Sequence, residues 1–418
     1  MSKIITSTLE KISAPEKRSI ISGPFGSNIS SKFFVESGVP VIRGNNLTIG
    51  HEKFIDSGFV FVTKEKAEEL NCYAYYNDLI FTAAGTLGQV GIIPQNATFD
   101  EYVISNKQIR VRLNTDIIDV MYAFYWFSSP WITQKLSNSN KGSTVPLLTL
   151  AEIRELPITY PESLDEQRRI VKMLDSLSDK IANNHRINNN LEAQARTIYD
   201  YWFSQFDFPN VDGKPYRSSG GRIVWNEQLK RYIPYGWSVV SLADLMVKNS
   251  TPFDYSSNKP TIDLSVMPSD SISLSELNNS TNFSTNLFEM KKGDILFGSI
   301  RPYLHKGGFA PCDGVVAGTV HSFSPINMDD YNFILFTLMR KQFFDYAVNA
   351  SSGTKMPVIS ADSIMNYKIA YNPQVAKAFN DIDIVDTISN NIMEIIELKH
   401  IRDFLLPMLM NGQAQIQD

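Results

Sequence analysis

An internal repeat that spans most of the 418 residues constrains the fold more than any other feature of the sequence. Three short motifs occur twice, in the same order and at nearly the same offset, while the residues between them differ strongly. The pairs are Tyr76–Phe81 (YNDLIF) and Lys292–Phe297 (KGDILF), Gly142–Pro146 (GSTVP) and Gly353–Pro357 (GTKMP), and Leu156–Pro161 and Tyr367–Pro373. The order of the motifs predicts two copies of one fold that have diverged in their loops.

Within each copy the pattern is that of a mixed α/β (α+β) domain. Val39–Gly44 and Val90–Pro94 are short apolar runs bounded by Gly, Pro and Asn, as strands and turns are. Ile109–Leu113 alternates apolar and basic residues, which is typical of a half-buried strand. Aromatic-rich segments at 117–127 and 331–344 are expected to be helical. We therefore predict similar globular domains at residues 1–161 and 232–373.

A long helical pattern follows each copy, at residues 162–206 and 374–414. The first has apolar residues on a 4-3-4 spacing, with Asn184 and Asn188 in the two remaining seam positions. The apolar seam residues are Ile170, Leu174, Leu177, Ile181, Leu191, Ala195, Ile198 and Trp202 in the first helix, and Ile388, Ile392, Ile395, Leu398, Ile401 and Leu405 in the second. A helix about 50 Å long with one apolar stripe must bury that stripe. We expect the two helices to form an antiparallel coiled coil whose register the asparagines fix.

Residues 207–231 break this pattern and are expected to form an irregular linker. Pro209, Gly213, Pro215 and the run Ser218–Gly221 lie in this stretch, and such residues are typical of turns. The second domain then opens at Pro234–Trp237.

Several of these motifs resemble those of the DNA-specificity subunits of type I restriction–modification systems. Pro161–Val171 (PESLDEQRRIV) is similar to the opening of the family's central helix, and Ser22–Ser27 (SGPFGS) to an element near the start of its recognition domains. Gly142–Pro146 resembles the loop before the closing strand, and Ile233–Trp237 (IPYGW) the opening of the second recognition domain. The second helix opening, Asn372–Phe379, lacks the EQRR signature, and Leu406–Gly412 keeps only the outline of the family's C-terminal pattern.

The resemblance implies a non-catalytic subunit with two target-recognition domains, each reading one half of a bipartite double-stranded DNA site. The paired helices would set the spacing between the half-sites and dock two methyltransferase subunits, and restriction subunits are optional further partners. The chain itself would hold no cofactor and no metal, since S-adenosylmethionine is expected in the partner methyltransferase. The half-site sequences and the spacer length are not readable from the chain.

Composition adds one conflicting signal. The formal net charge of −5 is unusual for a free-standing DNA binder, which draws affinity from basic side chains, so other subunits are expected to supply part of the grip on DNA. The two cysteines, Cys72 and Cys312, lie far apart, which fits a reducing compartment. The lack of a long apolar run or a secretory signal pattern predicts a cytoplasmic protein with no membrane partner.

Polar and basic side chains in the predicted loops are the candidate DNA contacts, because phosphates attract cations and hydroxyls while base edges need paired donors and acceptors. In the first domain they are Arg43, Asn45, Thr86, Gln89, Lys141, Ser143 and Thr144. In the second they are Arg301, Tyr303, His305, Lys306, Ser352, Thr354 and Lys355. Gln89 is expected to bond an adenine edge. The alternative for each residue is an ordinary polar surface position.

Two other classes of protein compete with this interpretation. A DNA methyltransferase needs an Asn/Asp-Pro-Pro-aromatic motif, and Asn372–Val375 (NPQV) lacks the second proline and the aromatic residue. A nuclease needs clustered carboxylates, which the sequence does not present. His305, Cys312 and His321 lack the tight spacing of metal ligands. A coiled-coil scaffold that never contacts DNA fits the acidic balance, but it gives no reason for two copies with different loops.

Overall fold

The structure, a computed structural model, describes residues 3–138, 147–255, 257–284, 286–414 and 416. The chain divides into two compact units: Met1–Ser178 with His400–Asp418, and Asp179–Lys399. Each unit has a β-rich head with part of the two long helices packed on it. We call residues 3–161 the first head and residues 238–371 the second head.

The first head contains two four-stranded sheets and a two-stranded one. The sheets have the strand orders β2-β9-β6-β7, β4-β3-β8-β5 and β1-β10. Between the strands that the structure describes in this head, every pairing is antiparallel except β3 with β8. The strands are β1 Ile4–Thr8, β2 Ile20–Ser22, β3 Val39–Ile42, β4 Val60–Val62, β5 Tyr73–Ala74, β6 Leu79–Thr82, β7 Val90–Ile92, β8 Tyr102–Ile104, β9 Gln108–Val111 and β10 Pro157–Pro161.

The second head repeats this topology strand for strand. Its sheets are β14-β21-β18-β19, β16-β15-β20-β17 and β13-β22, and β15 with β20 is the one parallel pairing among its described strands. The strands are β13 Ser238–Ser241, β14 Met246–Asn249, β15 Pro260–Ile262, β16 Asn278–Asn279, β17 Leu287–Met290, β18 Ile295–Gly298, β19 Gly307–Phe309, β20 Gly314–Ala317, β21 Val320–Pro325 and β22 Lys368–Tyr371. The duplication predicted from three short motifs therefore extends through the whole head.

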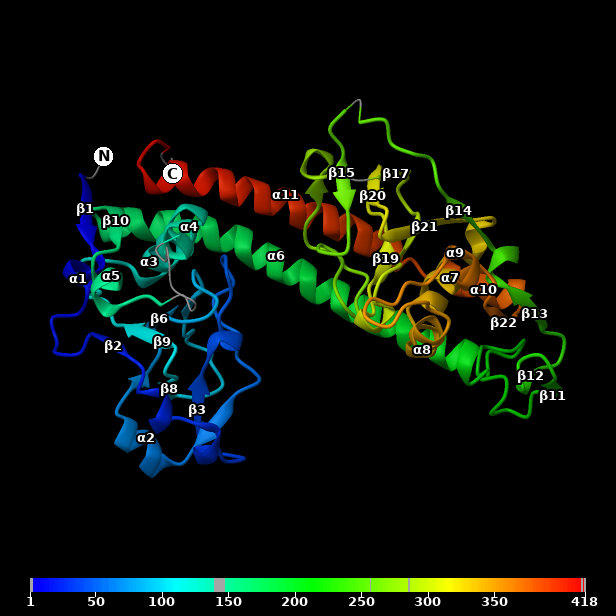
Figure 1. Cartoon of the computed structure of the whole chain (residues 1–418), viewed down its shortest axis with the longest axis horizontal. Helices are drawn as coiled ribbons and strands as arrows, with labels where there is room; N and C mark the ends of the chain where they lie inside the picture. The colour runs from blue at the N-terminus through cyan, green and yellow to red at the C-terminus, as the bar shows by residue number, and fades with distance from the viewer. Residues whose placement is uncertain (1–2, 139–146, 256, 285, 415, 417–418) are drawn as a thin grey trace. The chain divides into compact units, whose positions relative to one another are not determined.

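Short helices complete each head (Figure 1). The aromatic-rich segments are helical as predicted: they form α3 and α7, and their side chains are almost all buried. The helices of the first head are α1 Leu9–Ile12, α2 Lys64–Leu70, α3 Val120–Phe127, α4 Pro130–Asn138 and α5 Leu150–Arg154; those of the second are α7 Tyr331–Leu338, α8 Lys341–Asn349 and α9 Ala361–Met365.

The first long helix, α6, runs from Leu164 to Tyr199 and ends in a π-helical turn at Asp200–Ser204. The second segment differs from the single helix that we predicted at 374–414, because it is divided into α10 (Pro373–Asn380) and α11 (Val385–Met410). The side-chain amide of Asn332 donates to the carbonyls of Phe379 and Ile382, and these bonds stabilise the break between the two helices. No helix in the described ranges is long and apolar enough to cross a bilayer.

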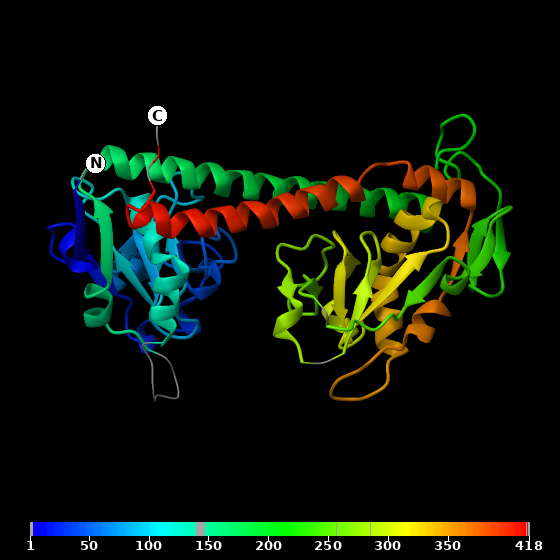
Figure 2. The ribbon, with the colours of Figure 1, turned by 90° about the horizontal axis from the view of Figure 1, so that it is seen from above.

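The two long helices pack antiparallel, and Figures 1 and 2 show them side by side. In the second unit, Asn184 donates to Glu394 at 2.7 Å, and Asn391 donates to Asn188 at 2.8 Å. The later residue on α6 therefore contacts the earlier residue on α11, as in an antiparallel pair. Both asparagines of α6 are buried. Asn184 and Asn188 therefore bond across the helix pair, in the positions where we expected register-fixing residues.

The apolar stripes also bury themselves in the heads. Ile170 and Leu174 belong to the core of the first head, together with the α11 residues Leu406, Leu409 and Met410. Ile388 and Ile392 belong to the core of the second head, and Leu191, Ile198 and Trp202 pack against it. Each stripe thus covers the base of a head as well as its partner helix.

One predicted seam position is wrong. Ile401 is 39% exposed, whereas the side chain of its neighbour Arg402 is only 12% exposed. Burial then continues through Leu405, Leu406 and Leu409. The 3-4 spacing along α11 therefore passes through the arginine, whose stem is buried while its guanidinium reaches Asp403 at 3.0 Å.

The segment expected to be an irregular linker is partly ordered into a β-hairpin. β11 (Ile223–Asn226) pairs with β12 (Arg231–Pro234). A small aromatic core supports it: Phe208 stacks on Tyr216 at 4.7 Å and contacts Trp237 at 5.2 Å. The Pro, Gly and Ser residues of this segment predicted a loop. The sequence did not predict the apolar contacts, because they join residues that lie far apart along the segment.

Gln167 in the EQRR stretch attaches the start of α6 to the first head. Its side chain is fully buried and makes three hydrogen bonds to backbone atoms. The amide donates to the carbonyls of Ile117 (3.2 Å) and Pro161 (2.8 Å), and the amide oxygen accepts from the N–H of Asp119 (2.7 Å). The glutamine is required because a single side chain here must be both donor and acceptor.

Replacing Gln167 by Ala is expected to lower the free energy of unfolding of the first unit by about 2–4 kcal/mol, because three buried backbone groups lose their partner. Scanning calorimetry of the full chain measures the loss, and hydrogen exchange should show faster exchange at the Asp119 amide. Arg168→Ala, at an exposed neighbouring position, is the control and should change the transition little. An unchanged first-unit transition in Gln167→Ala would show that these bonds contribute nothing.

His51 gives the first unit a pH dependence. Burial, with the nearby Arg402, lowers the pKa of this histidine to about 3, and its Nδ1 lies 2.8 Å from Ser128 Oγ. The unfolded chain takes up a proton near pH 6.5 and the folded chain does not, so stability is full above that pH and is lost as the pH falls toward 3. We expect the free energy of unfolding to fall by roughly 2–4 kcal/mol over this range. His51→Gln should make this fall with pH smaller. His400→Gln, at an exposed position, should leave it unchanged.

Candidate nucleic-acid interface

Most of the predicted site residues of the first head lie around one hollow. Arg43, Asn45, Thr86 and Gln89 line it, and its volume is about 380 Å³. They come from two places in the fold: the turn after β3, and the loop between β6 and β7. The sequence identified these two segments only as separate loops. The structure places them side by side, and the bonds from Gln89 Nε2 to the carbonyls of Gly44 and Leu47 hold them together.

The hollow also contains residues that sequence reasoning missed. Asn106 and Lys107 are exposed on the turn between β8 and β9, and Gln108 lies beneath them with 1% of its surface exposed. Within the described part of the chain, Arg43 Nε and Gln108 Nε2 are buried without an acceptor. The hollow thus combines the exposed cation of Lys107 with unused hydrogen-bond donors, which suits a ligand that carries acceptors. The only sequence signal for this part of the hollow is Asn106 followed by Lys107, a pair typical of a tight turn.

Gln89 does not present a free amide to this hollow. Its Nε2 donates to the carbonyls of Gly44 (3.0 Å) and Leu47 (2.8 Å), and its Oε1 accepts from Thr82 Oγ1 (2.9 Å). The expected bond between Gln89 and an adenine edge would compete with all three. Arg43 and Asn45 also bond to a carbonyl, that of Gly58, at 3.2 and 3.1 Å, but the backbone of this turn leaves Asn45 exposed.

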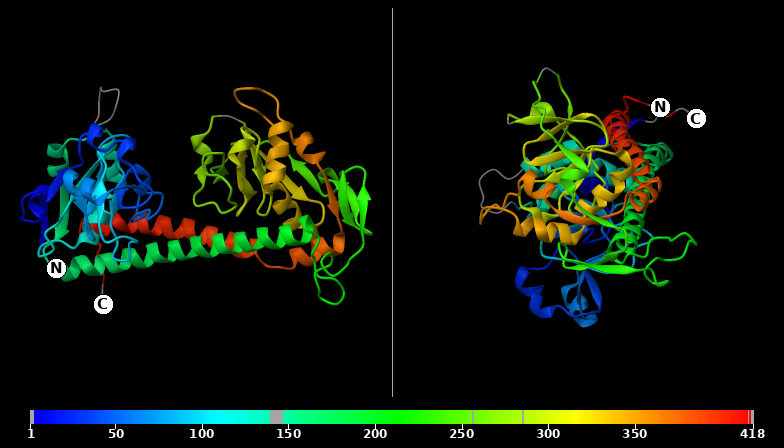
Figure 3. Two further views of the ribbon diagram at one scale, coloured as in Figure 1. Left: turned by 90° about the horizontal axis from the view of Figure 1, so that it is seen from below. Right: turned by 90° about the vertical axis from the view of Figure 1, so that its right-hand side faces the viewer.

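The second head brings two predicted loops together. The N–H of Arg301, in the loop between β18 and β19, donates to Pro357 O at 2.8 Å, and Ile359 N–H donates to Ser299 O at 2.9 Å. Arg301 and Tyr303 are exposed on one loop, and Ser352, Thr354 and Lys355 on the other. The loop that carries Lys355, drawn in orange, lies on the side of this head away from α6 and α11 (Figures 2 and 3).

His305 and Lys306 are held by the protein. His305 Nδ1 lies 2.6 Å from Asp270 Oδ1, and its ring stacks on Phe344 at 4.5 Å. The ammonium group of Lys306 donates to the carbonyls of Leu264 and Met267. Of the four predicted residues in this loop, Arg301 and Tyr303 are therefore the two whose side chains are exposed.

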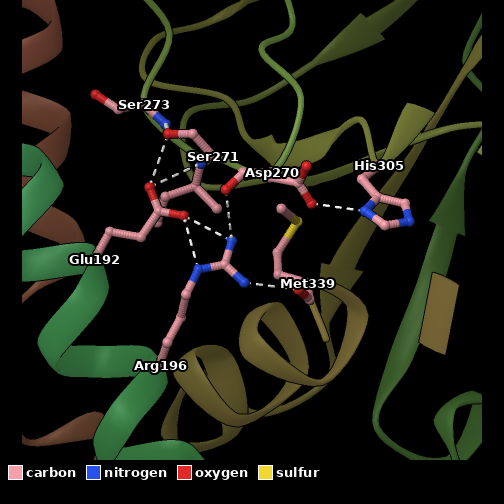
Figure 4. Close-up of polar contacts among 8 residues, drawn as sticks. Glu192, Arg196, Asp270, Ser271, Ser273, His305 and Met339 are labelled. Atoms are coloured by element: carbon pink, nitrogen blue, oxygen red, sulfur yellow. Dashed lines mark hydrogen bonds and ion pairs between the residues drawn. The ribbon is translucent and has the colours of Figure 1, made fainter. Parts of the chain in front are cut away.

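A polar network connects this region to α6 (Figure 4). Oε1 of the buried Glu192 accepts two bonds from Arg196, at 3.0 and 2.7 Å, and Oε2 accepts from Ser271 Oγ (2.8 Å) and Ile272 N–H (3.1 Å). Arg196 also donates to the carbonyl of Asp270, whose side chain holds His305. The four bonds to Glu192 come from a guanidinium, a hydroxyl and a backbone amide, so both oxygens of the carboxylate are paired.

Two further sets of predicted residues are placed as follows. Lys141, Ser143 and Thr144 lie outside the described residues. Apart from Ile401, the candidate helix-pairing residues are covered: Ile170, Leu174, Ile181, Ile388, Ile392 and Ile395 are buried, and Leu177, Leu191, Ile198, Trp202, Leu398 and Leu405 are half-buried. Their contacts are with the chain itself, which leaves the outer faces of the helices for any partner.

The residues weighed as signs of catalysis have structural roles. Asn372, in the partial methyltransferase-like motif, caps α10 by accepting from the N–H groups of Gln374 (3.0 Å) and Val375 (3.1 Å). Burial lowers the pKa of His321, whose Nε2 lies 3.0 Å from Ile359 O. Across the described ranges, no group of three or more His, Cys, Asp and Glu side chains is arranged to hold a metal ion.

Comparison with known proteins agrees with this architecture. A family model described as "Type I restriction modification DNA specificity domain" matches residues 26–193. The chain is 24% identical over 405 residues to the type I restriction enzyme MjaIX specificity subunit of Methanocaldococcus jannaschii, covering 91% of this chain and 88% of that protein. It is also 24% identical over 334 residues to the EcoDI specificity subunit of Escherichia coli, covering 75% and 71%.

A crystal structure of the type I restriction–modification S subunit from M. genitalium has the same fold. It superimposes with a TM-score of 0.56 at 14% identity, covering all of this chain and 97% of the other. Two β-rich heads of one topology, two long helices packed together and the matches to these proteins agree with one another, and together they support a DNA target-recognition specificity subunit of a type I restriction–modification system, which is the non-catalytic subunit.

Proposed function

We propose that each head reads one half of a bipartite DNA site and that α6 and α11 set the distance between the halves. The observation that carries this proposal is that the two heads share every strand pairing but differ in the loops that follow corresponding strands. The β6–β7 loop of the first head has the sequence AAGTLGQ, and the β18–β19 loop of the second has SIRPYLHK. A common frame with different loops is what reading two different sequences requires.

The two DNA-facing surfaces differ in character. In the first head, Arg43, Lys107 and the buried donors of the hollow favour acceptors such as phosphate oxygens or the guanine edge. In the second head, Arg301, Tyr303 and Lys355 are exposed on two neighbouring loops, and a guanidinium and an aromatic ring there suit the edge of a base pair and the adjacent backbone. We assign base reading to Arg301 and backbone contact to Lys355, Ser352 and Thr354.

The proposed role also implies partner subunits. We propose that two methyltransferase subunits dock on the outer faces of α6 and α11, that they carry S-adenosylmethionine, and that restriction subunits join the complex for cleavage. Because the chain has a net charge of −5, we expect these partners to make much of the contact with the phosphates.

The primary test is to map adenine methylation in a host that has the methyltransferase, with and without this chain. Loss of methylation at one split motif is the expected result, and unchanged methylation would contradict the role.

Removing the exposed cations of the second head should weaken DNA binding in two different ways. Arg301→Ala is expected to cost about 1–3 kcal/mol and to relax the sequence preference in one half-site, because a base contact is lost. Lys355→Ala should weaken binding to all sequences and lower the salt dependence by about one counterion, because a phosphate contact is lost. Fluorescence anisotropy of the complex with methyltransferase, over a salt series, measures both.

The control for these variants is Lys230→Ala. Lys230 is an exposed cation on the β11–β12 hairpin and pairs with Glu227 at 2.8 Å. Its removal should leave affinity and salt slope unchanged. An equal effect of all three substitutions would mean that only net charge matters, and the assignment of Arg301 and Lys355 to the DNA surface would be wrong.

Lengthening both long helices should change the gap between half-sites and leave the half-sites themselves unchanged. Four residues inserted after Ser178 and after Lys399 add about 6 Å of helix to each, which corresponds to about one to two base pairs of DNA. Methylation mapping reads out both the gap and the half-sites. The same insertion at Gly213, in a turn with open space around it, is the control and should alter neither. A changed half-site with an unchanged gap would contradict the spacing role.

A further inference from the structure

One loop in each head is fixed at both ends by equivalent contacts. We call residues 43–54, which follow β3, and residues 263–274, which follow β15, the anchored loops. The strands correspond because each makes the only parallel pairing of its head among the described residues: Ile42 pairs with Ile104, and Ile262 with Val316. Positions in the two loops can therefore be matched by counting from these strands.

The first fixed end is a clamp made by Gln89 and Lys306. Each of these residues stands directly before the strand that pairs with β6 or β18: Val90 pairs with Phe81, and Gly307 with Phe297. They occupy the same place in the two heads, although one is a neutral amide and the other a cation.

The carbonyls that they bind are also equivalent. Gln89 donates to Gly44 and Leu47, which are the second and fifth residues after Ile42. Lys306 donates to Leu264 and Met267, which are the second and fifth residues after Ile262. Two unlike side chains thus make the same pair of bonds, which indicates that the geometry of the anchored loop is the shared requirement.

The second fixed end is on the long helices. In the first unit, Lys53 Nζ lies 2.9 Å from Asp175 of α6. The residue that corresponds to Lys53 in the second unit is Ser273, whose hydroxyl accepts from Asn188 of α6 at 3.0 Å. Ser271 adds its bond to Glu192, as Figure 4 shows. In both units the anchored loop is therefore held at one end by Gln89 or Lys306 and at the other end by α6.

We propose that Gln89 and Lys306 are positioning residues for sequence reading, which set the shape of the DNA-facing loops without contacting a base. The argument deepens the proposed function and rests on it. In the first head the clamp spans the turn that presents Arg43 and Asn45, and in the second it ends the loop that presents Arg301 and Tyr303. Because base contacts lose discrimination when donors and acceptors are misplaced, the clamp of each head controls the specificity of that head alone.

The test compares discrimination in the two half-sites within one complex. The specificity subunit with its methyltransferase is assayed for methylation of the mapped site and of a panel in which single base pairs of either half are changed. The readout is the ratio of cognate to altered-site rates for each half. Lys306→Ala is expected to reduce this ratio about tenfold for one half and to leave the other unchanged. Gln89→Ala should do the same for the opposite half.

Conservative and distant variants serve as controls. Lys306→Arg retains two donors on a long stem and should restore the ratio. Lys368→Ala, an exposed lysine on β22, should leave both ratios unchanged. A loss of folding alone would lower the rates on every site and leave the ratios as they are, so it is distinguishable from loss of positioning; calorimetry of each variant identifies it.

Three outcomes would overturn the proposal. They are equal changes in both halves from one substitution, ratios that stay constant in both alanine variants, and loss of discrimination in Lys306→Arg equal to that in Lys306→Ala. The proposed function fails separately, since in that case the unmodified complex shows no dependence on the base pairs of one or both halves. The wild-type panel decides this before any variant is measured.

Discussion

The apolar stripe along α6 is the constraint on which the rest of the structure depends. A helix of 36 residues with one apolar face is not stable in water unless that face is covered. Here the cover comes from three sources: α11, the core of the first head around Leu174, and the core of the second head around Ala195 and Tyr199. Because the stripe continues through both units, neither head is free of the helix. The helix is thus part of the core of each head as well as a connection between them.

Packing against the same helices explains how the sequences of the two heads can diverge while both heads keep one strand topology. Asp78 and Asp294 occupy the same position before β6 and β18, and both are buried. Asp78 accepts from Arg112, whereas Asp294 accepts from Ser324, which stands at the equivalent place on the paired strand. The carboxylate needs donors, but a guanidinium and hydroxyls both provide them. Framework positions therefore tolerate a change of partner as long as the buried group remains paired, while the loops are free to change with their target.

The sequence predicted the elements that repeat or have a regular period, and it missed those that depend on distant contacts. The duplicated heads, the antiparallel helices and the polar centre at Asn184 and Asn188 follow from spacing alone. The break after Asn380 does not, because it depends on Asn332, and the choice of Arg402 over Ile401 for the seam depends on where α11 meets the first head. The candidate site shows the same division. Its loops were found, but Gln89 and Lys306 looked like DNA contacts because nothing local reveals that their donors are used by backbone carbonyls.

The internal use of charge also bears on how an acidic chain takes part in DNA recognition. Lys53, Arg112 and Arg196 are paired with Asp175, Asp78 and Glu192, so part of a modest complement of cations serves the fold. Neutralised cations contribute little to phosphate binding, and affinity that depends on phosphates is insensitive to sequence. We infer that the complex separates the two tasks: partner subunits supply most of the sequence-independent grip, and this chain supplies discrimination through a few well-positioned groups. A low net charge then has an advantage, because a specificity subunit that held every DNA tightly would have a smaller difference between cognate and other sites.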